Sequence, residues 1–194
     1  TRHRRADRGN RLGRRLLAAA RVGTLTERLR AEHALFALIL LGGTALRVLQ
    51  LDQSLFGDEL WTWVGATEPS PGGMLSWVDG DQEITPPLFT ALSWLSVRLG
   101  EDTLLLALPS LLAGIATMPI AYAIGRLVLD RRAAMIAMAA VALSPGLAFF
   151  SVEARAYSVA ILLSAAATLA MLLAVERGEH RWWWWALYAG ASAA

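Results

Sequence analysis

Uncharged apolar runs dominate the pattern of the chain: Thr103 to Gly125, Ala133 to Phe150 and Ala156 to Val175. Each is about as long as the ~20 apolar residues that a membrane-spanning helix needs. A further run, Ala34 to Leu51, contains one charge, Arg47, about one turn from its end. We expect this guanidinium to reach the membrane interface. The pattern therefore predicts an all-α fold, a polytopic α-helical membrane protein.

Another apolar segment begins at Trp182 and continues to Ala194, where the given sequence stops. It is shorter than the roughly 20 residues of a full span. We therefore expect an incomplete span at this end, and a fragment that is inactive on its own.

Charge gives the predicted spans a direction. Basic residues, all of them arginines, concentrate in residues 1–30 and recur in 126–132 and 177–181, whereas residues 52–102 are acidic. By the positive-inside rule, residues 1–30 form a cytoplasmic tail and residues 52–102 an outer loop. Residues 31–194 then form the transmembrane module of a multi-pass protein of the cell membrane, and the arginine bias is typical of a bacterial sequence.

Two alternative interpretations of the basic N-terminus are disfavoured. No base-stacking or groove-reading motif accompanies the arginines, so we expect no nucleic-acid partner and assign the charge to the lipid bilayer. A cleaved signal peptide would also begin with arginines before an apolar run. The spans that follow favour an uncleaved anchor.

The outer loop contains two apolar segments, Asp58 to Ala66 and Pro86 to Leu99, that are too short to cross the bilayer. We predict that both are interfacial helices. Thr85 is expected to cap the second of them, with Pro86 at its first helical position. The stretch Pro69 to Gly73 is expected to be the loop between them.

A second polar cluster follows the third predicted span. Pro145 should end or kink that helix near its outer end, after which the sequence reads EARAY. The predicted topology puts this stretch on the same side of the membrane as the acidic pair of the outer loop. The residues expected to form one site are Asp58, Glu59, Glu153, Arg155 and Tyr157.

Each of these charges has a structural and a functional interpretation. Asp58 and Glu59 fit the first turn of a helix, where the macrodipole stabilises carboxylates, and a surface carboxylate is also suited to accept a proton from a hydroxyl. Arg155 fits an ion pair that closes a helix junction, and a guanidinium also binds phosphate well.

Metal chemistry has little support in the sequence. Asp79, Asp81 and Glu83 offer oxygen ligands for a divalent cation, but a solvated acidic loop explains the same pattern. The chain has no cysteine, which excludes thiol nucleophiles and zinc–thiolate sites. It also lacks a glycine-rich phosphate loop and a nucleophile elbow.

The order of five segments resembles a known family. After a first span come SLFGDELWT, EITPPLFTALSW, LALPSLLAGIATMPIAYAIGRLVLDRRA and ALSPGLAFFSVEARAYSVAILL. This order is similar to that of bacterial membrane glycosyltransferases of family 39, the protein-O-mannosyltransferase-like branch of the GT-C superfamily. Two positions depart from the family's usual pattern: Val152 stands where Gln is frequent, and Phe89 where Tyr is frequent.

The resemblance implies an inverting transfer of sugar from a polyprenyl-phosphate-sugar donor to a hydroxyl of a glycan, lipid or protein at the outer face. It implies Asp58 as the catalytic carboxylate, supported by Glu59, and Arg155 at the donor phosphate, with Glu153 and Tyr157 beside it. Glu83 matches a position that contacts acceptor or metal in some relatives. A divalent metal ion there is the only cofactor implied.

A secondary transporter, or a flippase for a lipid-linked substrate, is the alternative function. It predicts charged or helix-breaking positions near the bilayer midplane. The charges of this chain lie at span ends, and Pro119 is the main breaker within a span. The sequence therefore favours the transferase.

Overall fold

The computed structural model describes residues 27, 29–51, 55–80, 86–100, 104–177 and 182–193. These residues form helices and their connections, with no strand among them. The chain divides into two compact units, Thr1–Leu38 and Ile39–Ala194. The described part of the first unit is helical, and the architecture below is that of the second unit.

Three helices in the described ranges are long and apolar enough to cross a membrane: Leu29–Val48, α5 (Leu104–Val128) and α8 (Tyr157–Arg177), in which the candidate span is Tyr157–Glu176. The pair α6 (Arg131–Leu143) and α7 (Pro145–Val152) makes a fourth if the two form one broken span. This confirms a multi-pass α-helical membrane protein. The first span begins and ends earlier than the predicted 34–51.

The third predicted span is two helices that meet at an angle of 55°. Pro145 has no N–H to continue the hydrogen bonding of α6, and Ser144 has an extended backbone conformation (φ −64°, ψ 118°). The Ser144 hydroxyl then accepts the Leu147 N–H at 3.4 Å and caps α7. The predicted kink at Pro145 is confirmed.

The described residues of the predicted outer loop form three helices and a short 3₁₀ turn: α2 (Asp58–Thr67), α3 (Pro71–Val78), α4 (Pro87–Ser96) and Val97–Leu99. The prediction that Pro69 to Gly73 is a loop was wrong from Pro71 onward. Ser70 accepts the Gly73 N–H at 3.0 Å and caps a helix there. Pro86 is the N-cap of α4 and Pro87 its first residue, one position later than predicted; Thr85 lies outside the described residues.

Arg98 and Trp94 fix the end of α2 against α4. The Arg98 guanidinium donates to the Ala66 and Glu68 carbonyls at 3.4 and 2.7 Å, and the Trp94 indole N–H donates to the Glu68 carbonyl at 2.9 Å. The guanidinium also stacks on the Trp94 ring, 3.3 Å from its centroid. Arg98, the only base in the predicted outer loop, therefore satisfies carbonyls at a helix end.

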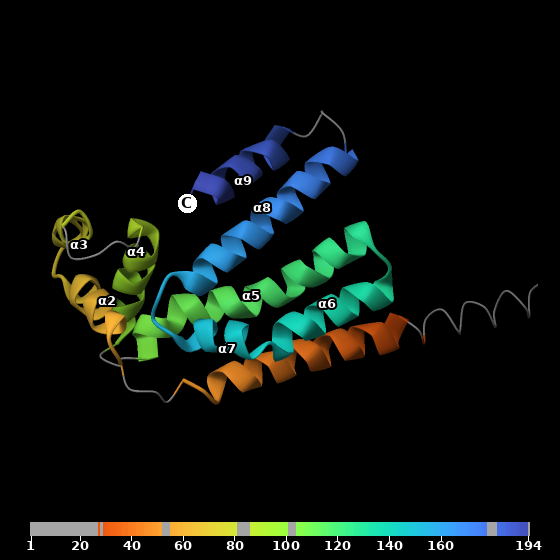
Figure 1. Ribbon diagram of the computed structural model, residues 1–194, viewed down its shortest axis with the longest axis horizontal. Coiled ribbons are helices and arrows are strands. Elements are labelled where there is room, and N and C mark those ends of the chain that lie inside the picture. Colours follow the sequence, from red (N-terminus) through yellow and green to blue (C-terminus); the bar gives the residue numbers. More distant parts are fainter. Residues whose placement is uncertain are drawn as a thin grey trace, which may run out of the picture. The chain divides into compact units, whose positions relative to one another are not determined.

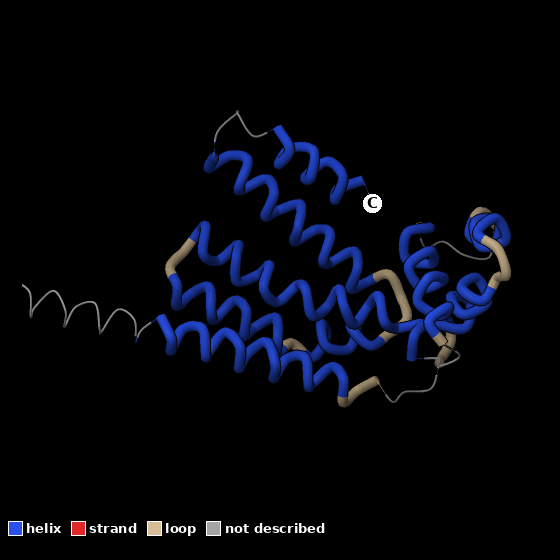
Figure 2. The backbone as a smooth tube through the Cα atoms, turned by 180° about the vertical axis from the view of Figure 1, so that it is seen from behind, coloured by secondary structure: helices blue, strands red, loops and turns tan. Residues whose placement is uncertain are grey.

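Helix α5 is the centre of the second unit, and α4, α6, α7 and α8 all pack against it (Figure 1). Seen from behind, α9 (Trp182–Ala193) lies along α8, and α2 to α4 gather at the end where α5 begins (Figure 2).

Pro109 leaves the Leu105 carbonyl of α5 without its usual helical donor. The Ser96 hydroxyl of α4 donates to that carbonyl at 2.7 Å, so α4 is anchored at this break.

The prediction that the Arg47 side chain reaches the membrane interface was wrong, because this side chain is fully buried. Its guanidinium donates to the Gly43, Ala142 and Val141 carbonyls at 2.9, 3.1 and 3.2 Å. The last two belong to the end of α6. The arginine therefore points into the helix bundle.

Gly43 allows the part of the first span that belongs to the second unit to lie close to α6 and α5. A Cβ atom at this position would lie 2.6 Å from the Met118 sulfur and 2.9 Å from Ala142 Cβ, whereas a Cβ at Gly42 would meet nothing within 4 Å. Small residues at such crossings are what allow membrane helices to pack closely.

Replacing Gly43 by Ala should therefore destabilise the protein by about 1–3 kcal/mol, the usual cost of overpacking. Gly42→Ala in the same helix is the matched control and should be near neutral. Thermal unfolding in detergent would measure both variants. Equal effects of the two substitutions would contradict this packing.

Candidate active site

Gly57 directs the chain into α2 so that two carboxylates stand in its first turn. Its φ of +54° favours glycine, and the Leu60 N–H bonds back to the Gly57 carbonyl at 3.1 Å. Asp58, the first residue of α2, has a side chain that is 71 % exposed. Its carboxylate is therefore accessible to solvent and to a dissolved substrate.

Glu59 joins two segments that are distant in the sequence. One carboxylate oxygen accepts the Phe56 N–H at 3.0 Å, and the other accepts the Ala154 N–H at 2.6 Å. Ala154 is fully buried in an apolar cluster with Ala66 and Leu106. Because both oxygens of Glu59 bind backbone amides, this residue holds the start of α2 against the connection between α7 and α8.

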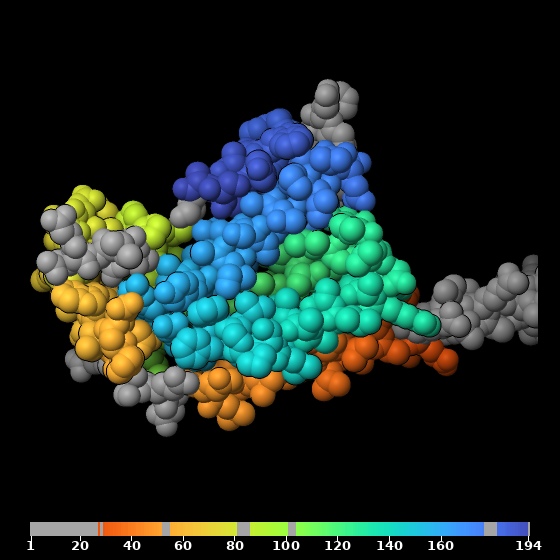
Figure 3. Space-filling view, viewed as in Figure 1, coloured from red at the N-terminus to blue at the C-terminus, as the bar shows by residue number. Residues whose placement is uncertain are grey.

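Arg155 lies in that connection and reaches Asp58. Its Nη1 donates to the Asp58 carbonyl at 3.2 Å, and its Nη2 lies 3.7 Å from Asp58 Oδ2. The Arg155 carbonyl accepts the Ser110 hydroxyl of α5 at 2.9 Å. The backbone of Arg155 is therefore held by α5, while its largely buried side chain, only 11 % exposed, reaches Asp58. In Figure 3 the orange atoms of α2 border the light blue atoms at the start of α8.

Glu153 is the carboxylate with the most unfavourable surroundings in the site. Its Oε2 atom is buried and has no hydrogen-bond partner among the described residues. Burial raises the pKa of Glu153, the nearby Glu59 and Asp58 raise it further, and Arg155 partly opposes them. Protonation of Glu153 is therefore favoured by its environment.

The remaining predicted site residues have different outcomes. Tyr157 begins α8, is 46 % exposed, and packs its ring 5.0 Å from that of Phe150. Glu83 lies outside the described residues. Among the residues that the structure describes, no group of three or more His, Cys, Asp or Glu side chains is arranged to hold a metal ion.

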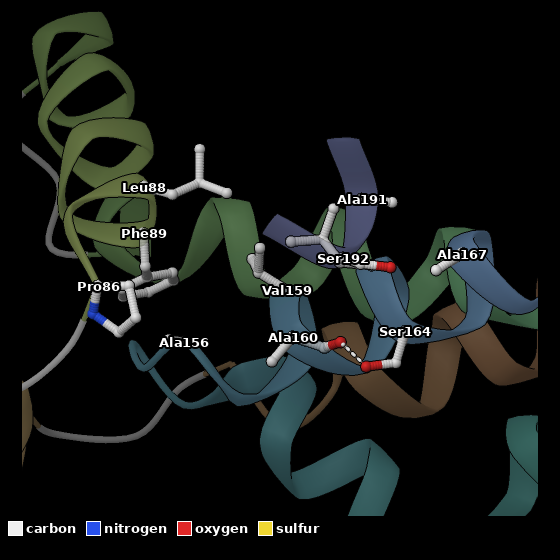
Figure 4. Close-up of a pocket in the computed structure, with 11 residues that line it drawn as sticks. Pro86, Leu88, Phe89, Ala156, Val159, Ala160, Ser164, Ala167, Ala191 and Ser192 are labelled. Atoms are coloured by element: carbon white, nitrogen blue, oxygen red, sulfur yellow. Dashed lines mark hydrogen bonds between the residues drawn. The ribbon is translucent and has the colours of Figure 1, made fainter. Parts of the chain in front are cut away.

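An apolar cavity of about 380 Å³ begins beside the site. Ala156, the neighbour of Arg155, lines it, and Phe89 of α4 faces Val159 of α8 across it, with Ser192 of α9 nearby (Figure 4). A second apolar cavity of about 820 Å³ lies between α4, α5 and α8 and shares Val159 with the first. The charged cluster therefore stands next to apolar space large enough for part of a lipid chain.

Sequence reasoning missed the residues that hold this cluster in place. Ser110 and Ser151 are single hydroxyls within apolar runs, and both are fully buried. A buried serine needs a partner, but the sequence does not identify that partner. In the structure it is the Arg155 backbone for Ser110 and the Arg47 side chain for Ser151.

Comparisons with known proteins add one match. The family model described as dolichyl-phosphate-mannose-protein mannosyltransferase matches residues 85–194, which is more than half of the chain. No curated protein matches the sequence. No solved structure matches it.

Glu153 should make stability depend on pH. The pKa of Glu153 in the folded protein is raised above the ordinary value near 4.5. The contribution of the protonated side chain to folding stability is therefore complete below that value and is lost as pH rises through the folded-state pKa. Relative to Glu153→Gln, the wild type should therefore lose stability over the pH range that begins near the ordinary value of 4.5 and extends upward. Thermal unfolding of both proteins across this range would test it, and a pH-independent difference would contradict it.

Proposed function

Because the chain belongs to the dolichyl-phosphate-mannose-protein mannosyltransferase family, we propose that it transfers a sugar from a polyprenyl-phosphate carrier to a hydroxyl group at the extracytoplasmic face. The family match makes it a membrane glycosyltransferase of the mannosyltransferase type. The observation that supports the rest is the approach of Arg155 Nη2 to Asp58 Oδ2, 3.7 Å apart although the residues are 97 positions apart in sequence.

Asp58 acts as the base in this proposal. Its exposed carboxylate accepts the proton of the acceptor hydroxyl as that oxygen attacks the anomeric carbon. The bond from this carbon to the carrier phosphate breaks on the opposite face of the sugar, and the phosphate leaves with the electron pair. One displacement of this kind inverts the anomeric configuration and leaves the proton on Asp58.

Arg155 stabilises the leaving phosphate. A guanidinium presents several N–H groups to phosphate oxygens, and fixed donors are most effective where charge develops in the transition state. The donor must separate Arg155 from the Asp58 carboxylate when it binds. An ion pair with one exposed member contributes only about 0–1 kcal/mol to stability, so separating the two side chains costs little free energy.

Glu59 has a positioning role in this proposal, because both of its oxygens already bind amide N–H groups. It keeps Asp58 near Arg155 and takes no proton from the acceptor. Glu153, when protonated, lowers the negative charge that an anionic donor meets. Glu153 and Tyr157 then line the donor side of the site.

The apolar cavity beside Arg155 supports a lipid-linked donor. It extends from Ala156, just before α8, to Ala167 within α8, and the helical stretch from Val159 to Ala167 is roughly 12 Å long at 1.5 Å per residue. A polyprenyl chain placed there would have its phosphate at Arg155 and its isoprene units against alanine and leucine side chains. The acceptor, a glycan, lipid or protein, would approach Asp58 from its exposed side, and from the sequence resemblance we propose Glu83 as an acceptor or metal contact.

The orientation of the protein completes the proposal. Residues 1–30 are placed in the cytoplasm of a bacterial cell and the site at the outer surface of its plasma membrane, following the distribution of arginines. Polyprenyl-phosphate sugars presented at that surface would then reach Arg155 from within the bilayer.

Replacing Asp58 by Asn removes the proposed base with little change in size. Transfer of sugar from a polyprenyl-phosphate donor, measured in lipid with the intact protein, should fall about 10²- to 10⁴-fold. Membrane insertion and thermal stability should be nearly unchanged, since the pair with Arg155 is exposed on the Asp58 side. Glu68→Gln, at the other end of α2, is the matched control. Undiminished transfer by Asp58→Asn would overturn the assignment.

A further inference from the structure

Arg47 is a buried charge outside the proposed site. Its side chain is 0 % exposed and lies within the helix bundle. Each of its three nitrogens donates to the protein: Nη1 to the Gly43 and Ala142 carbonyls, Nη2 to the Val141 carbonyl, and Nε to the Ser151 hydroxyl at 3.0 Å. Among the described residues no carboxylate is paired with it.

Two of these carbonyls exist as acceptors because α6 is broken. Pro145 cannot donate to the Val141 carbonyl four residues earlier, and the turn at Ser144 ends the helix before the Ala142 carbonyl finds a helical partner. The end of a helix also has a partial negative charge, which a cation stabilises. The guanidinium therefore replaces the donors that α6 lacks.

The fourth acceptor belongs to the other helix of the pair. Ser151 lies in the last turn of α7 and donates its own proton to the Leu147 carbonyl. The Arg47 Nε–H thus binds the end of α7 while the Nη groups bind the end of α6. One rigid, planar side chain spans the break.

Gly114 makes room for this contact on α5. A Cβ atom at Gly114 would fall 2.0 Å from Ser151 Oγ and 3.4 Å from Arg47 Nε. The residue therefore lets α7 lie directly against α5, beneath the connection that contains Glu153 and Arg155.

The free-energy cost of burying a charged arginine indicates that Arg47 has a role other than stabilising the fold. Placing an arginine inside a membrane helix is unfavourable, and an apolar side chain of similar volume often replaces a buried charge without loss of stability. An arginine at this position is therefore better explained by the geometry that it imposes on α6 and α7.

We infer that Arg47 is a positioning residue for glycosyl transfer. By holding both sides of the break, it sets the direction of α7 and so the place where Arg155 emerges relative to Asp58. It does not touch the substrate. This inference rests on the proposed function, because it concerns the same pair of residues.

The test uses Arg47→Met, which keeps the length and removes the charge. Because the chain has no cysteine, spin labels can be placed through Ile136→Cys on α6 and Phe149→Cys on α7, both exposed positions. We expect the distance distribution between the labels to shift or broaden in Arg47→Met. Donor kcat/KM should fall by about 10- to 100-fold, as expected for a displaced catalytic group, with thermal stability retained.

Ser151→Ala is the second variant. If Arg47→Met does not accumulate in the membrane, the same two measurements on Ser151→Ala test the inference. It removes only the contact to α7 and should change both measurements in the same direction. Thr117→Val is the matched control, because its buried hydroxyl bonds only the Ala113 carbonyl of its own helix. It should leave the label distances and the activity unchanged.

An unchanged distance distribution in Arg47→Met and Ser151→Ala would overturn the inference, and so would unchanged kcat/KM. The distances do not depend on activity. A wild-type protein that transfers no sugar from any polyprenyl-phosphate donor would contradict the proposed function, while the distances would still decide the role of Arg47 in the bend.

Discussion

A break in a helix within the apolar part of a membrane leaves backbone carbonyls that no water can satisfy, and this constraint shapes the whole second unit. The break at Ser144 and Pro145 is stabilised by the Arg47 guanidinium, which binds the Val141 and Ala142 carbonyls. The break turns the chain by 55°. That turn places the end of α7, and the charged stretch after it, beside the start of α2.

Side chains also donate hydrogen bonds to unsatisfied backbone carbonyls at the end of α2 and before Pro109 in α5. The Arg98 guanidinium satisfies carbonyls at the end of α2, and the Ser96 hydroxyl satisfies the Leu105 carbonyl that Pro109 leaves without a helical donor. Each of these contacts joins one of the helices between residues 58 and 99 to a neighbour. These short helices are therefore fixed by polar groups at helix ends, while small residues such as Gly43 allow close packing between the spans.

Apolar run length was enough to predict the class of protein and the approximate spans, because a bilayer demands about 20 apolar residues whatever the fold. The alternation of charge along the chain also predicted that the Asp58 and Arg155 segments meet. Their partners could not be predicted. The bond from Glu59 to Ala154 and the burial of Arg47 depend on the tertiary packing of helices, and α3 was missed because Ser70 and Pro71 begin a helix as readily as they form a turn.

The central claim is that Asp58 and Arg155 act on one sugar phosphate. A cryo-EM structure of the intact protein in lipid nanodiscs with a bound polyprenyl-phosphate sugar tests this most directly. The account predicts phosphate oxygens within about 2.7–3.2 Å of the Arg155 guanidinium, the lipid in the cavity along α8, and the anomeric carbon facing Asp58. A phosphate bound away from Arg155, with the sugar out of reach of Asp58, would contradict it.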